Sequence, residues 1–171
     1  MVKLAILGAL GVLVEEADGP GPDWLPLPGS LEAVGRLNRA GIRVVLAFNE
    51  PALGRGSLTP QALNARHHRL CARLARIGAH LEGIFFCPHA PEAGCGCRIP
   101  ATGLHEEILR RFGVEAGNSV LIGVTPDELA AAGPLGARAI MLTPVTDGSV
   151  RVAGPRSLAE AVEGLLRDDA P

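Results

Sequence analysis

The sequence has little lysine, little net charge and no long apolar run, and each shortage excludes a class of function. Lys3 is the only lysine among 171 residues, and all other basic side chains except the histidines are arginines. A formal net charge of -2 gives no electrostatic basis for binding nucleic acid or an anionic membrane. No apolar run approaches the ~20 residues that cross a bilayer. The N-terminus has no signal-peptide cleavage pattern, so we expect a cytoplasmic protein.

The length and the hydrophobic content of 47% suit one domain spanning 1–171 with a full core. Continuous apolar runs are typical of strands covered on both faces, as in a parallel sheet. We predict such strands at 3–8, 43–48, 83–86, 119–123 and 138–142. Helical patterns lie between them, two of them capped by Ser30 and Thr59, and three more at 103–112, 127–133 and 157–167. This order predicts a doubly wound α/β sheet, with its site beyond the carboxyl ends of the strands.

A cysteine-rich stretch, "CPHAPEAGCGC" at 87–97, contains the four candidate metal ligands Cys87, His89, Cys95 and Cys97. Three thiolates and one imidazole are a normal structural zinc shell, and such a closed shell shapes a loop rather than performing chemistry. A disulfide or unpaired thiols are the alternatives, and a chain without an export signal disfavours the disulfide. Cys71 is expected to be a small core residue. His67, His68, His80 and His105 have no partner motif and are expected on the surface or in packing.

The stretch "CPHAPEAGCGCRIPATGL" resembles the zinc loop of bacterial D-glycero-D-manno-heptose 1,7-bisphosphate phosphatases and of the related histidinol-phosphate phosphatases. Both belong to the haloacid dehalogenase (HAD) superfamily. The resemblance continues in "LPLPGSLEAVGRLNRAGIRVVLAFNEPALGRG" and in "SVLIGVTPDELAAAGPLGARAIML". It implies a HAD-like, Rossmannoid sheet with a zinc loop. It also implies phosphate ester hydrolysis through an aspartyl-phosphate, with Mg²⁺ between carboxylates and phosphate.

The chain departs from this family at the catalytic positions. The nucleophile, the acid/base group, the phosphate-binding hydroxyl, the lysine and the metal-binding aspartate are replaced by Gly8, Leu10, Phe48, Ile99 and Val124. Lys3 begins the first strand and is expected at the opposite edge of the sheet. Glu50 would repel a phosphate, and Pro51 has no N–H to donate. These changes predict a catalytically inactive pseudophosphatase with a binding or regulatory role and without the Mg²⁺ site.

Some candidates for ligand contact remain. Asn49, Arg55 and Arg98 are the side chains expected to bind an anion, and the ligand would be a sugar phosphate or a protein partner. Trp24 would either anchor such a partner or pack its own loop. A second hypothesis is an active phosphatase for heptose bisphosphate or histidinol phosphate that uses displaced carboxylates. The candidates for that role are Glu15, Glu16, Asp18, Asp127 and Glu128. A third hypothesis is a decaying duplicate of a pathway enzyme.

Overall fold

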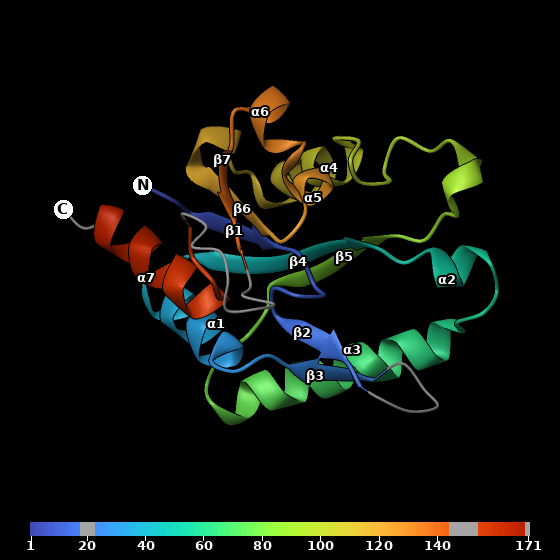
Figure 1. Ribbon diagram of the computed structural model, residues 1–171, viewed down its shortest axis with the longest axis horizontal. Helices are drawn as coiled ribbons and strands as arrows, with labels where there is room; N and C mark the ends of the chain where they lie inside the picture. The colour runs from blue at the N-terminus through green and yellow to red at the C-terminus, as the bar shows by residue number, and fades with distance from the viewer. Residues whose placement is uncertain (18–22, 144–153, 170–171) are drawn as a thin grey trace, which may run out of the picture.

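A five-stranded parallel sheet forms the centre of the computed structural model, which describes residues 1–17, 23–143 and 154–169 (Figure 1). The spatial order of its strands is β5-β4-β1-β6-β7. The strands are β1 (Leu4–Leu7), β4 (Arg43–Asn49), β5 (Gly83–Cys87), β6 (Ser119–Gly123) and β7 (Arg138–Met141). The predicted strands and the parallel α/β fold are therefore confirmed. Each predicted strand agrees with the observed one to within one residue at either end.

Helices cover both faces of the sheet (Figure 1). One face carries α1 (Ser30–Arg39), α3 (Pro60–Arg76) and α7 (Leu158–Asp168), and the other carries α4 (Gly103–Phe112), α5 (Pro126–Leu129) and α6 (Ala132–Leu135). The short helices α2 (Pro51–Gly54), η1 (Pro91–Ala93) and η2 (Ala116–Asn118) lie in the connections. Side chains of β1 alternate between the two faces, so the sheet separates two apolar clusters. Because the helices cover the two faces of the sheet, the ends of the strands remain open to a ligand.

A small antiparallel hairpin was not predicted from the sequence. β2 (Val14–Glu16) pairs with β3 (Trp24–Pro26) in the region that we expected to be a loop. Val14 and Trp24 are both buried, and they attach the hairpin to the cluster beneath α1 and α3. Strands of three residues are too short to show a period-2 pattern, which explains the wrong prediction. Asp18 lies outside the described residues.

Two helix predictions need correction. The segment predicted as a single helix over 127–133 forms the two short helices α5 and α6. Ser30 is the first residue of α1 and not its cap, because the cap position is taken by Gly29 with φ 71°. The Ser30 hydroxyl instead donates to the carbonyl of Leu13 at 2.7 Å. The Thr59 cap is confirmed, since its side chain accepts a hydrogen bond from the backbone N–H of Ala62.

The parallel pairing brings the carboxyl ends of all five strands to the same edge of the sheet. β1 pairs with β4 on one side and with β6 on the other, and the chain passes to the second side only after β5. A reversal of this kind is the topological switch point at which open α/β sheets bind ligands. It lies beyond Leu7 of β1 and Gly123 of β6. Within the described ranges, no helix has the length and apolar character needed to cross a bilayer.

Candidate functional site

A cavity of about 630 Å³ opens at the carboxyl ends of the strands, where the topology places the site. Residues from both faces of the sheet line it. They are Ala9, Leu10, Glu16, Trp24, Phe48, Asn49, Glu50, Pro51, Arg66, Arg98, Ile99, Val124, Thr125, Asp127 and Glu128. Four carboxylates and two guanidinium groups therefore share the wall. Such convergent charges in a cleft are typical of a ligand site.

The carboxylate of Glu128 lies at the switch point, directly over Gly8. A Cβ atom built on Gly8 would come within 2.5 Å of Oε1 of Glu128. Oε2 is held from the other side by the backbone N–H groups of Val124 (2.8 Å) and Thr125 (2.9 Å), and by the Thr125 hydroxyl (3.1 Å). Thr125 and Glu128 thereby form a capping box at the start of α5. Because Gly8 has no side chain, the carboxylate of Glu128 from α5 can lie at the end of β1.

The other changed positions line the same cavity as this carboxylate. Leu10 is exposed and Val124 packs over Gly11, and both line the cavity. Phe48 and Ile99 are buried in the two clusters on opposite faces of the sheet. None of these four side chains carries a polar atom, so they shape the cavity walls and offer no hydrogen bonds.

Asn49 lines the cavity, but both polar atoms of its side-chain amide are hydrogen-bonded within the protein. Its Nδ2 donates to the carbonyl of Ile99 at 2.9 Å, and its Oδ1 accepts from the N–H of the same residue at 2.9 Å. The side chain thereby fastens the end of β4 to the segment that follows the cysteine-rich loop. The geometry makes Asn49 a positioning residue for that segment.

The two predicted anion-binding arginines lie in different places. Arg98 lines the cavity, and its Nη1 donates to the carbonyl of His89 at 3.2 Å. Arg55 is exposed at the end of α2 and is not part of the cavity wall. Of these two arginines, Arg98 alone lines the cavity.

Sequence reasoning missed a buried charged pair in the wall. Arg66 of α3 is 3% exposed and donates to the carboxylate of Glu50, which follows β4. The guanidinium carbon lies 4.3 Å from the centre of the Trp24 ring, in a cation–π contact. The only signal in the sequence is an arginine at a core-facing position of α3, four residues before Leu70. Trp24 is buried, so its predicted packing role is the one observed.

His67 lies beside this pair, among aromatic rings. Its ring centre is 5.5 Å from that of Trp24, 6.0 Å from Phe48 and 5.8 Å from Phe86. Burial, followed by the nearby charge of Arg66, lowers the pKa of His67 to about 4. The imidazole is therefore neutral at physiological pH and packs as part of the aromatic cluster of Trp24, Phe48 and Phe86.

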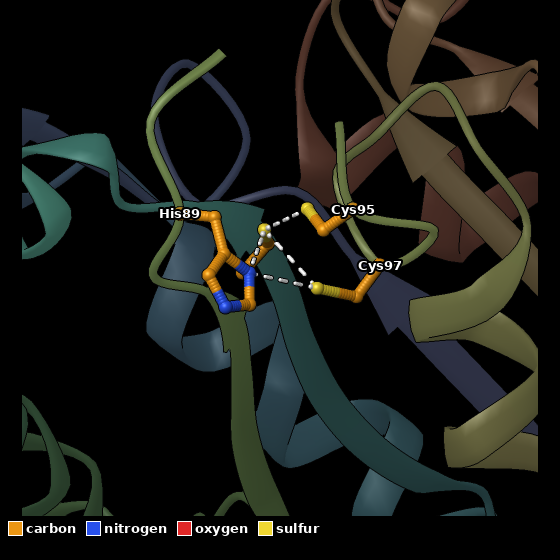
Figure 2. A group of neighbouring side chains, drawn as sticks. His89, Cys95 and Cys97 are labelled. Carbon is orange, nitrogen blue, oxygen red and sulfur yellow. Dashed lines mark hydrogen bonds between the residues drawn. The ribbon is translucent and has the colours of Figure 1, made fainter. Parts of the chain in front are cut away.

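The cysteine-rich loop brings its four predicted ligands together. The ligand atoms of Cys87, His89, Cys95 and Cys97 all lie within 4.8 Å of one another. Sγ of Cys87 is 3.5 Å from Sγ of Cys95, and Nδ1 of His89 is 3.3 Å from Sγ of Cys97. Figure 2 shows the side chains of His89, Cys95 and Cys97 converging from two arms of the loop. This donor set and spacing are consistent with a tetrahedral zinc site.

Comparison with known proteins gives a consistent set of relatives, although no family model matches the chain. D-glycero-beta-D-manno-heptose-1,7-bisphosphate 7-phosphatase from Bordetella bronchiseptica is 40% identical over 138 residues, which cover 79% of this chain and 77% of the relative. The Pseudomonas aeruginosa protein of the same name is 35% identical over 150 residues, covering 86% and 80%. The crystal structure of the Bordetella phosphatase with magnesium and phosphate has a TM-score of 0.85 at 33% identity, covering 98% and 99% of the two chains.

These relatives correct the expectation of a catalytically inactive protein. That expectation was based on the residue at each catalytic position taken separately. It is overturned because the chain is similar, over most of its length, to proteins that are phosphatases. In addition, a carboxylate from α5 occupies the space above Gly8, which a comparison of single motif positions does not reveal. The resemblance on which the argument rested is confirmed. The chain belongs to the D-glycero-D-manno-heptose 1,7-bisphosphate phosphatase family of the HAD superfamily.

Proposed function

We propose that this protein is a phosphomonoesterase that acts on a phosphorylated heptose, as the names of its relatives indicate. The observation that carries the proposal is the carboxylate of Glu128 at the switch point of the sheet. Catalysis requires a reacting group held to a fraction of an ångström. The three hydrogen bonds to Oε2 hold Glu128 in that way and leave Oε1 directed toward Gly8.

Glu128 would act as the general base of the reaction. Its Oε1 takes a proton from a water molecule, and the oxygen of that water attacks phosphorus as the bond from phosphorus to the sugar oxygen breaks. The leaving sugar oxygen receives the proton that Glu128 took from the water, so the products are the sugar alcohol and inorganic phosphate, and Glu128 is a carboxylate again. Asp127 is the nearest second acid on the same helix, and it also lines the cavity.

Arg98 would bind the phosphate oxygens. Among the described residues the only hydrogen bond of its side chain runs from Nη1 to the carbonyl of His89, which leaves further N–H groups for a ligand. A guanidinium group suits phosphate because it can donate two parallel hydrogen bonds. The hydrogen bond to His89 ties this arginine to the cysteine-rich loop, so the loop fixes the position of the phosphate.

The residues present fit a Mg²⁺ ion shared with the substrate. Mg²⁺ is usually bound by one or two carboxylates together with substrate phosphates and water, and Asp127 lines the cavity as a candidate ligand beside Glu128. When bound, the ion would supply positive charge to the phosphate. The wall needs such charge, because its four carboxylates outnumber its two arginines. The loss of this site, expected from Val124, is not shown.

Zinc would be held by Cys87, His89, Cys95 and Cys97. Four protein ligands close the tetrahedral shell, so this ion would have a structural role. The segment that leaves the loop carries Arg98 and Ile99, and Asn49 fastens its backbone. Zinc would thus position the phosphate-binding arginine.

The test is phosphate release by the purified, zinc-loaded protein from heptose 1,7-bisphosphate, with and without Mg²⁺. The matched variant is Glu128→Gln, because glutamine also completes a capping box and so preserves α5. We expect Mg²⁺-dependent release by the natural protein and a loss of roughly 100-fold or more in the variant. No release by the natural protein, or equal release by the variant, would overturn the proposal.

A further inference from the structure

The buried pair of Arg66 and Glu50 forms a wall of the cavity on the side of α3. Arg66 is 3% exposed, and the side chain of Glu50 is 13% exposed. One nitrogen of the guanidinium, Nη2, donates to Oε2 of Glu50. The buried Nε has no partner among the described residues, and Arg66 lines the cavity. The pair therefore has hydrogen-bonding capacity that the protein itself does not use.

Fastening α3 to the hairpin does not account for the pair. Arg69 already pairs with Asp23 at 3.1 Å, and Arg73 donates to the carbonyl of Trp24 at 3.0 Å. Removing two charges from water is costly, and apolar side chains of similar size often serve packing equally well. A buried pair with unused donors in a cavity wall is better explained by a ligand.

The charge of the pair determines the chemistry of that ligand. The carboxylate of Glu50 neutralises Arg66 and would repel a second phosphate, so an anion is a poor occupant. A hydroxyl group both donates and accepts hydrogen bonds, so adjacent hydroxyls can donate to a carboxylate and accept from a guanidinium. Trp24 and Phe48 supply apolar surface beside the pair for the carbon chain. The imidazole of histidinol phosphate offers no such row of hydroxyls.

We propose that Glu50 and Arg66 form a subsite for the hydroxylated carbon chain of the substrate, and so select a polyol phosphate over an ester without hydroxyl groups. This inference rests on the proposed function for the location of the phosphate beside Arg98. The two ends of the ligand would be held from opposite faces of the sheet. Arg66 belongs to α3 and Glu128 to α5, and both residues line the cavity. Figure 1 shows these two helices on opposite faces of the sheet.

The test is calorimetric binding of two probes of equal chain length, D-glucitol 6-phosphate and hexyl phosphate, with Mg²⁺ removed so that neither ester is hydrolysed. The natural protein should bind the glucitol ester at least about tenfold more tightly, as expected for hydrogen bonds to charged groups. Glu50→Gln should reduce this preference severalfold or more. The matched control is Asp23→Asn, which breaks the neighbouring ion pair with Arg69 outside the cavity and should leave the preference unchanged.

Equal binding of both probes by the natural protein would overturn the inference, as would an unchanged preference in Glu50→Gln. If that variant fails to fold, the double variant Glu50→Leu with Arg66→Met removes both charges at once and should lose the preference. Because binding is measured without turnover, the two proposals separate. If tighter binding of the glucitol ester depends on Glu50, the subsite is supported even when no phosphate is released. If phosphate is released but both probes bind equally, the proposed phosphatase activity stands and the subsite does not.

Discussion

A Cβ atom on Gly8 would lie 2.5 Å from Oε1 of Glu128, so the glycine and the carboxylate are complementary. Gly8 is joined to the sheet by a hydrogen bond from its N–H to the carbonyl of Ile122 at 2.9 Å. The end of β1 is therefore fixed in place, while the atom that would collide is the end of a flexible side chain. A side chain at position 8 would displace the carboxylate rather than the strand.

Replacing Gly8 with alanine should separate activity from stability. The added methyl group should push the Glu128 carboxylate away from the strand end, and we expect phosphate release to fall about tenfold or more. The free energy of unfolding should change by less than about 1 kcal/mol, because only the end of the Glu128 side chain moves. Gly117→Ala is the control, since its nearest neighbour would be 3.9 Å away. Full activity in Gly8→Ala would count against a catalytic role for Glu128.

Removing the metal from the cysteine-rich loop should lower the melting temperature. A bound ion would hold the four ligands together, so stripping it with a chelator should lower the melting temperature by roughly 5–15 °C in calorimetry. Cys97→Ser should have a similar effect. Cys71→Ser is the matched control, because Cys71 lies exposed on α3 away from the cluster and is not the core residue that the sequence predicted. A melting temperature that does not respond to chelation would show that the loop needs no metal.

Losing the Asn49 side chain should loosen the segment that carries Arg98. Asn49→Ala removes both hydrogen bonds to the backbone of Ile99 and leaves buried polar groups without partners. We expect a loss of about 1–3 kcal/mol in the free energy of unfolding, together with weaker phosphate binding. Asn64→Ala, at an exposed position of α3, should change neither quantity. The result to look for is a raised KM, which a purely structural role would not produce in the folded fraction.

Stability should fall as the pH is lowered from about 6.5 toward 4. Burial lowers the pKa of His105 to about 4, and burial together with Arg66 lowers that of His67 to about 4. In this window the unfolded chain binds protons at these histidines and the folded protein does not, so the unfolded state is favoured. Above pH 6.5 both states are neutral and this contribution is constant.

Urea unfolding at pH 7 and pH 4.5 measures this effect. His67→Phe should reduce the loss of stability between the two values by on the order of 1 kcal/mol, since phenylalanine suits the aromatic wall and does not titrate. His68→Gln, at the exposed neighbouring position, should leave the loss unchanged. A pH dependence identical in His67→Phe and the natural protein would mean that His67 is protonated in the folded state.

The elements that could be predicted are those whose signal lies within a short window of sequence. The strand β6 was predicted to the residue because its buried positions form one continuous apolar run. The metal ligands could be predicted because all four lie within one loop. The hairpin of β2 and β3 was missed because its two short strands come together through the burial of Val14 and Trp24.

The carboxylate of Glu128 shows why the rest could not be predicted. Its position depends on the absence of a side chain at Gly8, which lies on a strand far away in the sequence. The pair of Arg66 and Glu50 likewise joins α3 to the end of β4 through tertiary packing. Comparing motif positions one at a time detects what each residue lacks. It does not detect what a neighbour in space supplies.

Trp24 gives the cavity an optical reporter of its own. The sequence contains one tryptophan and no tyrosine, so the intrinsic fluorescence of the protein comes almost entirely from the indole beneath Arg66. A ligand that draws the guanidinium toward itself would alter the emission of that ring. Unlabelled protein is therefore sufficient to follow ligand binding and release by stopped-flow fluorescence under single-turnover conditions.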